Sequence, residues 1–428
     1  MTESYPVVRH TLDNGLTVVV CADHLVPEVS INIGVSVGSR QEEPGQTGLA
    51  HLFEHLMFEG SEHVAEGEHF AELMSHGGRC NATTSFDRTC YFETVPRGAA
   101  ELALWLEADR HTRLLPAVTR ANVDNQRDVV VEEKRQRYDN QPYGDALVAM
   151  CGAVFPEGHP YRHPPIGSME DLQAASLDTV RAFYRQHYGP SRTVLTLVGD
   201  LTAEEGLHWA QRYFASAPQP GEELGPEPPG TLPLSPLTEP HRRSMTGVVP
   251  TDRVYLCFRL PQVTSPDYLP CAIALDLLGG MSSSAVHRRL VREREIVIDC
   301  GAAALGLVDG TSLAYVVADV EASSSVEEVE DALCSELARH GEAAPREEML
   351  AAAKAGAERS WLESLASTEE RADVIGRAML THRDPDYVNT HLDDLRAVDA
   401  EHVATVARRY LRPESRSVLT YRRTGTAA

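Results

Sequence analysis

The chain has 428 residues, of which 42% are hydrophobic and 24% are charged, and this globular composition excludes disordered and collagen-like proteins. Its 63 acidic residues outnumber its 39 Lys and Arg residues and give a formal net charge of −24. Because so acidic a surface repels phosphate backbones and anionic lipid, we expect no nucleic acid and no membrane among its partners. If the acidic residues line a cavity, basic peptides or metal ions are favoured.

The first half of the chain combines β-rich runs with amphipathic helical patterns. Strands are predicted at residues 16–21, 29–37, 80–85, 89–95 and 193–198. Helices are predicted at residues 47–58, 68–74, 99–115, 120–138 and 203–214, the last of them capped by Thr202.

A proline-rich stretch follows at the midpoint. Residues 216–240 hold eight prolines in 25 positions, and because proline removes a backbone donor and fixes φ, an extended linker is predicted there. The alternative is a long surface loop within one domain. Beyond it, strands are predicted at residues 254–260, 296–304, 312–320 and 418–421, with a helix at 271–278 and mainly helices from 326 to 409.

Both halves therefore mix strands with several helices, which is typical of an α+β fold. We expect two structurally similar halves, each a mixed, largely antiparallel sheet with helices packed on it. The expected divisions are an N-terminal domain at residues 1–215, the linker at 216–242 and a related C-terminal domain at 243–428.

The N-terminus and the cysteines bear on the compartment. Residues 1–6 lack the basic and then apolar pattern of a secretory signal, and the apolar runs are far shorter than the ~20 residues that span a bilayer. The eight cysteines are scattered without a CxxC pair, which favours thiols in a reducing cytoplasm over disulfides or a cysteine zinc site. We expect a cytoplasmic protein, and a trimmed leader would leave secretion open.

The residues that carry chemistry begin in the predicted helix at 47–58. His51 and His55 are four positions apart, so both imidazoles project from one helix face and can reach one ion at the ~2.0–2.1 Å zinc–nitrogen distance. Glu54 borders the same face. The resulting HxxEH pattern is the inverted form of the HExxH motif of metallohydrolases. The alternative is a helix with two packed or solvated histidines and a capping glutamate.

A catalytic zinc ion normally has three protein ligands, so a third must come from another element. Glu132 and Glu133 are adjacent in a predicted helix and point about 100° apart, so only one of them can face inward. Glu133 shares a stripe with Gln126, Val129 and Val130, and it is the predicted ligand. The alternative is that both glutamates are solvated surface charges, as is usual for such a pair.

The HLFEH segment at residues 51–55, followed 78 positions after His55 by Glu133, resembles the pitrilysin/insulinase family of zinc peptidases. The most similar branch contains the mitochondrial processing peptidase and its bacterial relatives. Further similar segments are LDNGL at residues 12–16, the glycines at 45 and 48, GGRCNATT at 77–84, HPY at 159–161 and GGMSS at 279–283.

This resemblance implies that His51, His55 and Glu133 hold Zn²⁺ and that Glu54 is the general base in peptide hydrolysis. Gln126 stands where the family usually has a glutamate that supports the metal ligands, and an amide there adds no charge. The strand at 80–85 would be a sheet edge to which an extended peptide adds, with Asn81 and Ala82 in contact with its backbone. The alternative, if Asn81 is considered alone, is an ordinary turn residue at the start of a strand.

The family also uses an Arg and a Tyr, seven positions apart, to stabilise the developing oxyanion. The corresponding positions here are Val291 and Ile298, and a register shifted by one gives Arg292 and Asp299. The resemblance therefore implies that this chain is the zinc-bearing subunit of a heterodimer. A homologous partner would supply the Arg and Tyr, and the second half of this chain would close the peptide chamber. The alternatives are a non-catalytic assembly subunit of the same fold and a metal-dependent hydrolase of some other substrate.

Overall fold

The computed structural model describes residues 4–217 and 233–425. The chain forms two compact units, each assembled from three segments. Unit 1 contains Met1–Glu133, His163–Pro229 and Trp361–His391, and unit 2 contains Lys134–Arg162, Gly230–Ser360 and Leu392–Ala428. Most of the predicted linker lies outside the described residues. The boundaries 1–215, 216–242 and 243–428 divide the chain by sequence and stay a prediction.

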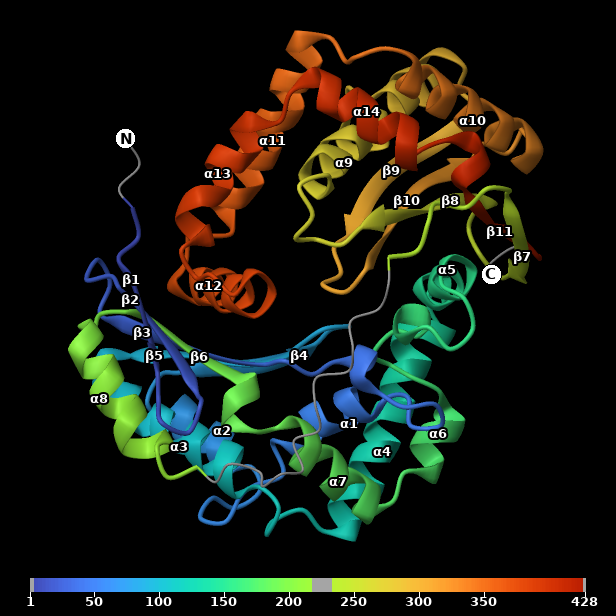
Figure 1. Cartoon of the computed structure of the whole chain (residues 1–428). Coiled ribbons are helices and arrows are strands. Elements are labelled where there is room, and N and C mark those ends of the chain that lie inside the picture. The colour runs from blue at the N-terminus through green and yellow to red at the C-terminus, as the bar shows by residue number, and fades with distance from the viewer. Residues whose placement is uncertain (1–3, 218–232, 426–428) are drawn as a thin grey trace. The chain divides into compact units, whose positions relative to one another are not determined.

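Unit 1 is built on a six-stranded sheet in the order β1-β2-β6-β3-β5-β4 (Figure 1). Only β2 and β6 run parallel, and every other neighbouring pair is antiparallel. Strand β4 is therefore the last strand at one end of the sheet. The strands are β1 (Val7–Thr11), β2 (Thr17–Ala22), β3 (Glu28–Val35), β4 (Arg79–Thr84), β5 (Thr89–Pro96) and β6 (Thr193–Gly199).

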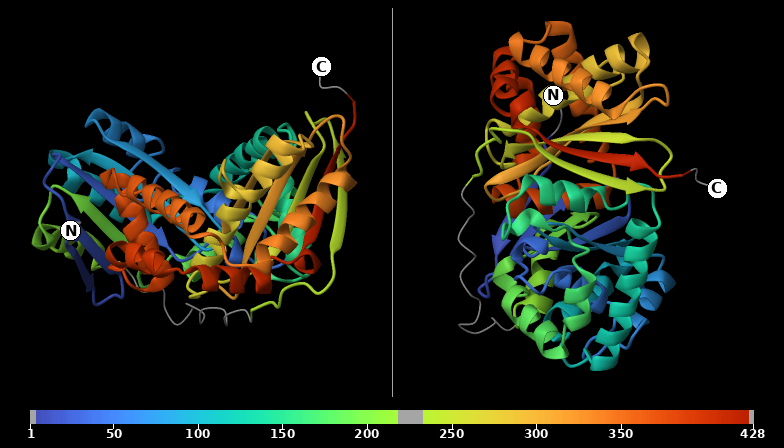
Figure 2. Two further views of the ribbon diagram at one scale, coloured as in Figure 1. Left: turned by 90° about the horizontal axis from the view of Figure 1, so that it is seen from above. Right: turned by 90° about the vertical axis from the view of Figure 1, so that its right-hand side faces the viewer.

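Helices cover both faces of this sheet. On one face, Val18 and Val20 of β2 pack against α3 (Ala100–Arg113) and α8 (Ala203–Phe214). On the other face, Val19 and Cys21 pack against α12 (Thr368–His382), which lies across the sheet in the views of Figure 1 and Figure 2. Since successive side chains point to opposite faces, a strand covered on both sides is apolar throughout, as the sequence of β2 is.

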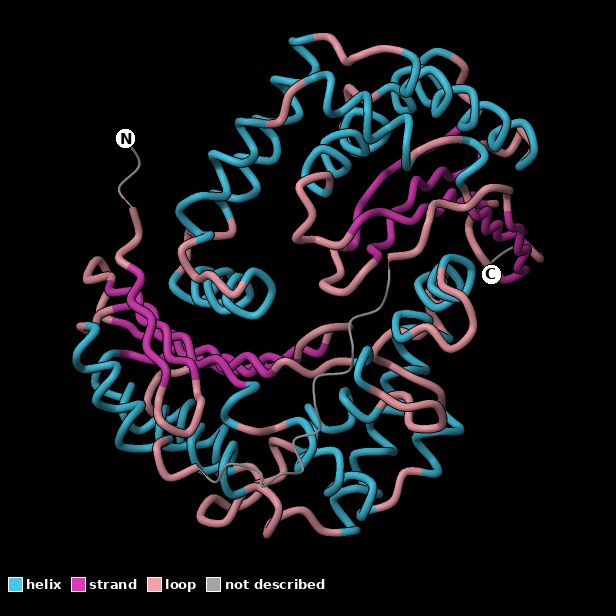
Figure 3. The backbone as a smooth tube through the Cα atoms, in the orientation of Figure 1, coloured by secondary structure: helices cyan, strands magenta, loops and turns pink. Residues whose placement is uncertain are grey.

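Unit 2 contains a five-stranded sheet, whose strands are among those coloured magenta in Figure 3. The strand order is β7-β11-β8-β10-β9, and only β7 and β11 run parallel. Helices α9, α10 and α14 share one apolar core with this sheet, and α5 packs against β8 and β11. The strands are β7 (His241–Gly247), β8 (Arg253–Pro261), β9 (Val297–Leu305), β10 (Thr311–Val320) and β11 (Ser417–Arg423). The helices are α5 (Ala146–Val154), α9 (Tyr268–Leu275), α10 (Val326–Glu342) and α14 (Ala400–Tyr410), with α11 (Glu347–Glu363) and α13 (Tyr387–Ala397) between α10 and α14 in the chain and divided between the two units.

The two sheets share one topology. Across each sheet, the strands β2 to β6 and the strands β7 to β11 lie in the same order: the first strand in the chain, then the last, the second, the fourth and the third. The parallel pair also has the same place in both sheets. This confirms the predicted α+β fold with two similar halves. The helices are exchanged, because α12 follows the proline-rich stretch but packs in unit 1, whereas α5 precedes it but packs in unit 2. Within the described residues, no helix has the length and apolarity needed to cross a bilayer.

Candidate metal centre

Helix α1 (Leu49–Leu56) carries the HxxEH segment and follows β3 in unit 1. Its buried side chains, which include Leu52, Phe53 and Leu56, fix one face of the helix in the core. His51 and His55 lie on the half-buried face, with 12% and 21% of their side chains exposed, and their rings meet edge-on with centroids 4.9 Å apart. Both imidazoles therefore project from one face of α1, as the four-residue spacing predicts.

The start of α1 is held by a residue that the sequence reasoning missed. Gly48 precedes the helix at φ +94°, where an L side chain is strained, and it offers no side-chain cap. The carboxylate of Glu42 takes this role and accepts hydrogen bonds from the amides of Gly48 (2.9 Å) and Ala50 (2.8 Å). His163 lies 2.8 Å from the same carboxylate. A negative charge at a helix N-terminus is favourable, so Glu42 fixes where α1 begins.

Helix α4 (Arg120–Lys134) brings Glu133 to the two histidines. Its Oε2 lies 3.3 Å from Nε2 of His55 and 3.6 Å from Nε2 of His51, and the three candidate ligand atoms all lie within 4.8 Å of one another. Ligand atoms of a tetrahedral zinc ion, with bonds of about 2.0–2.1 Å, lie about 3.3 Å apart. Two imidazoles and one carboxylate at this spacing therefore fit zinc. The adjacent Glu132 is exposed, as the helical phase predicts.

The carboxylate of Glu54 is held by strand β4. The hydroxyl of Thr84 donates a hydrogen bond to Oε2 of Glu54. The sequence reasoning missed Thr84, although its alternation with Ala82 along a strand beside the predicted site was a usable signal.

Gln126 lies beside His55, with Oε1 3.2 Å from Nδ1 of the imidazole. Burial lowers the pKa of His55, but the hydrogen bond to Glu133, the charges of Glu54 and Glu133 and the contact with Gln126 outweigh it and raise that pKa above the ordinary value. The imidazole is therefore surrounded by groups that stabilise positive charge. A metal cation at Nε2 would meet the same favourable field.

The predicted substrate contacts lie on strand β4, at the end of the sheet. Asn81 is exposed and pairs with Phe92 of β5 in register, while Ala82 is 7% exposed. The side chain of Asn81 accepts a hydrogen bond from the amide of Ala82 at 2.9 Å. A peptide that added to this edge would compete with the Asn81 side chain for that amide.

A cavity of about 430 Å³ opens beside this centre. The aromatic rings of Phe58 and Phe70 stack with centroids 4.8 Å apart on its wall. No Lys or Arg is among its described lining residues, which are Glu54, His55, Phe58, Glu59, Glu66, Gly67, Phe70, Asn81 and Gln126. The cavity thus combines carboxylates with an aromatic surface, a lining that attracts cations.

A second His/Glu cluster lies within unit 1, formed by His69, Glu93 and Glu107. Its carboxylates face a cation of the protein itself, because the guanidinium of Arg110 donates to both oxygens of Glu107 and is only 2% exposed. Burial and the charge of Glu107 raise the pKa of Glu93 well above its ordinary value, so a proton takes the place of a second positive charge. A metal ion there would meet the charge of Arg110, so the first cluster is the better metal candidate.

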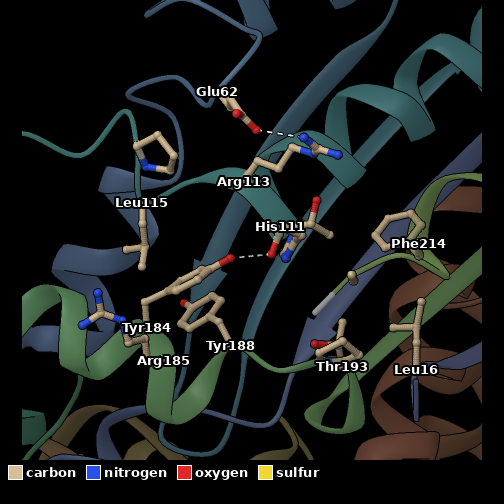
Figure 4. Close-up of a pocket in the computed structure, with 14 residues that line it drawn as sticks. Leu16, Glu62, His111, Arg113, Leu115, Tyr184, Arg185, Tyr188, Thr193 and Phe214 are labelled. Carbon is tan, nitrogen blue, oxygen red and sulfur yellow. Dashed lines mark hydrogen bonds and ion pairs between the residues drawn. The ribbon is translucent and has the colours of Figure 1, made fainter. Parts of the chain in front are cut away.

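A separate cavity of about 300 Å³ contains none of the predicted site residues (Figure 4). Tyr184, Tyr188, Leu115 and Phe214 give it an apolar lining. The hydroxyl of Tyr184 donates a hydrogen bond to the carbonyl of His111 at 2.6 Å, and a dashed line marks this bond in Figure 4. Its lining lacks the convergent carboxylates and imidazoles of the first cluster.

At Val291 and Ile298, the positions compared first with the family's Arg and Tyr, the second half has no polar pair, and the shifted register of Arg292 and Asp299 has no tyrosine. Val291 packs against the apolar core of unit 2, and Ile298 in β9 is 48% exposed. Neither side chain can donate a hydrogen bond.

Family models match both halves of the chain. Residues 17–155 match the insulinase family (peptidase family M16), and residues 174–356 match the peptidase M16 inactive domain. The chain is similar to a solved structure of a protease from Helicobacter pylori, with a TM-score of 0.90 and 23% identity over 98% of this chain and 100% of that one.

Two curated relatives are similar in sequence. The zinc protease PqqE of Helicobacter pylori is 29% identical over 300 residues, which cover 67% of this chain and 64% of that protein. The probable mitochondrial-processing peptidase subunit beta of Schizosaccharomyces pombe is 24% identical over 270 residues, which cover 63% of this chain and 58% of that protein. The chain thus matches less than two thirds of the length of either relative. With both halves matched, the chain belongs to the insulinase family of peptidases, peptidase family M16.

Proposed function

We propose that the chain is a zinc-dependent endopeptidase that hydrolyses extended or unfolded peptides. The observation that carries this proposal is the convergence of His51, His55 and Glu133, whose ligand atoms lie within 4.8 Å of one another. The relative from Helicobacter pylori is named a zinc protease, which supports the same metal and the same reaction class.

In this proposal His51, His55 and Glu133 hold the metal. A zinc ion there supplies a coordinated water with a pKa near ~7 and polarises a peptide carbonyl. Glu54 acts as the general base, accepts the proton of the attacking water and returns it to the leaving amine. Thr84 holds one carboxylate oxygen of Glu54, so the proton is accepted at a fixed position.

The substrate lies along β4 in an extended conformation. Main-chain hydrogen bonds to a sheet edge bind many sequences, because they do not depend on side chains. Asn81 and Ala82 then exchange their mutual hydrogen bond for contacts with the peptide backbone. The acidic, aromatic cavity beside the centre favours peptides that carry Lys or Arg.

We further propose that the chain works with a homologous partner subunit. The apolar side chains of Val291 and Ile298 leave the oxyanion without the Arg and Tyr that the family supplies, and two copies of this chain would share the deficit. The relative from Schizosaccharomyces pombe is named as one subunit of a peptidase, which is consistent with such a division. Location in the cytoplasm stays a prediction.

Metal analysis tests the zinc centre. The purified chain should carry one tightly bound zinc ion, Glu133→Gln should lose it, and the matched variant Glu132→Gln at the exposed neighbour should keep it. A wild-type chain without tight zinc would instead support the non-catalytic assembly subunit.

Peptide cleavage tests the division of labour. The isolated chain should hydrolyse an unfolded peptide slowly or not at all, and a similar-sized relative that carries the Arg and Tyr should restore turnover. Rapid zinc-dependent cleavage by the isolated chain would refute the need for a partner while leaving the peptidase proposal intact.

A further inference from the structure

Beyond the metal-binding residues, a continuous chain of hydrogen bonds leads from His55 to a second carboxylate. Nδ1 of His55 is 3.2 Å from Oε1 of Gln126, and Nε2 of Gln126 donates to Oε1 of Glu59 at 2.6 Å. All three side chains are half-buried. Glu59 follows α1 and is four positions beyond His55, so the helix that carries the histidines also leads to this carboxylate.

The chemistry of each group fixes the direction of every hydrogen bond in this chain. A carboxylate only accepts, so the NH₂ end of Gln126 must point to Glu59 and its oxygen to His55. That oxygen also only accepts, so His55 must carry its proton on Nδ1. The other nitrogen, Nε2, faces Glu133, 3.3 Å away, and there the proposed metal would take the place of the proton that Nε2 shares with this carboxylate.

We propose that Glu59 is a positioning residue of the metal centre, which acts through Gln126 to hold His55 in the tautomer that binds a metal through Nε2. Glu59 also provides the negative charge that the amide of Gln126 lacks. Carboxylates that hydrogen-bond a metal-binding histidine raise its basicity and fix its ring, and their loss typically weakens metal binding about 10- to 100-fold. This inference rests on the proposed zinc centre.

The competing explanation is that Glu59 only ties the end of α1 to α4. Its second oxygen, Oε2, accepts a hydrogen bond from Nδ2 of Asn122 in α4 at 2.8 Å. Asn122 is fixed in turn because its Oδ1 accepts from the amide of Thr119 at 3.1 Å. Asn122→Ala therefore removes half of this tie and leaves the contacts among Glu59, Gln126 and His55 in place, so it is a matched control.

The test is a set of zinc dissociation constants, measured by chelator competition on the full-length chain. Glu59→Gln should raise the constant about 10- to 100-fold, the range observed when such supporting carboxylates are lost. Asn122→Ala should change it by less than about 3-fold, since this half-buried hydrogen bond lies outside the chain that links Glu59 to His55 and contributes little to metal binding. Thermal unfolding of each metal-free variant checks that it is folded.

The double variant Glu59→Gln with Gln126→Glu exchanges the amide and the carboxylate. It places the negative charge directly on Nδ1 of His55 and lets the amide introduced at position 59 donate to the new carboxylate, so zinc affinity should return toward the wild-type value. Because the three metal ligands are unchanged, the visible spectrum of bound cobalt(II) should match that of the wild type.

Several results would overturn the inference. Equal weakening by Glu59→Gln and Asn122→Ala, without recovery in the double variant, would assign Glu59 a purely structural role. Wild-type affinity in Glu59→Gln would remove it from the centre altogether. In both cases the wild-type chain still binds zinc, so the proposed function stands. A wild-type chain that binds no zinc would overturn the proposed function and this inference together.

Discussion

The buried carboxyl group of Glu93 provides a sharp test of the charge balance in unit 1. Glu93 is 0% exposed, and neither of its oxygens accepts a hydrogen bond from a described residue. Burial and the neighbouring charge of Glu107 raise its pKa well above the 4.5 of an ordinary glutamate. Between pH 4.5 and that raised pKa, the folded protein therefore holds a proton that the unfolded chain has released.

The size of the effect follows from this proton. The stability that neutral Glu93 contributes is complete below pH 4.5 and falls as the pH rises toward the folded-state pKa, by about 1.4 kcal/mol per pH unit. Glutamine does not titrate and can still donate to Glu107. For each pH unit between pH 5 and the folded-state pKa, the free energy of unfolding of Glu93→Gln should therefore rise by about 1.4 kcal/mol relative to the wild type.

Urea unfolding followed by tryptophan fluorescence measures this difference, because all three tryptophans, Trp105, Trp209 and Trp361, lie in unit 1. Metal-free buffers at pH 5, 6 and 7 give the slope, and Glu204→Gln at a glutamate on the surface of α8 is the control. A difference between variant and wild type that does not change with pH would mean that Glu93 is ionised in the folded protein. The inferred charge balance, in which Arg110 is matched by Glu107 alone, would then be wrong.

Three further variants test the supports of the site and of the fold. Thr84→Val removes the hydroxyl that holds the general base, so peptide hydrolysis, measured with the Arg- and Tyr-bearing partner present, should fall roughly 10-fold with zinc retained. Thr83→Val on the same strand should have no effect, and equal rates for the wild type and Thr84→Val would contradict the role of that hydroxyl. Glu42→Ala removes the cap of α1 and should lower the free energy of unfolding of unit 1 by about 2 kcal/mol. Glu43→Ala at the exposed neighbour should leave that free energy almost unchanged, and an equal decrease in both variants would argue against the cap. Ile375→Ala in α12 should destabilise unit 1, as seen by tryptophan fluorescence, by about 2–5 kcal/mol, and a loss below about 1 kcal/mol would mean that α12 does not complete that core.

Much of the centre could be predicted because its geometry is local. Two histidines four positions apart share a helix face wherever the helix forms, and the phase of α4 alone separates the half-buried Glu133 from the exposed Glu132. The distance between Glu133 and the histidines depends instead on how α4 packs against α1. That packing involves residues far apart in the chain, so only the family resemblance indicated it.

Other features escaped prediction for identifiable reasons. Strand β7 has the sequence HRRSMTG and is mostly exposed, so it lacks the alternation that marks a strand, and its pairing with β11 makes it one. Glu59 continues the four-residue spacing of His51 and His55, but the partner that gives this carboxylate a role lies on α4. The exchange of α5 and α12 could not be predicted from the local sequence, because the amphipathic pattern of a helix is the same whichever of the two sheets it packs on.

The exchanged helices make the two halves interdependent. After a backbone cut between the two halves, α12 would still pack on the valines of β2 and β6, and α5 would still pack on β8 and β11. The two fragments should therefore stay associated. Either half produced without the other would instead present a bare apolar sheet face to water, with aggregation as the consequence. Two separate polypeptides made together in one cell could restore the whole molecule by completing each other's cores.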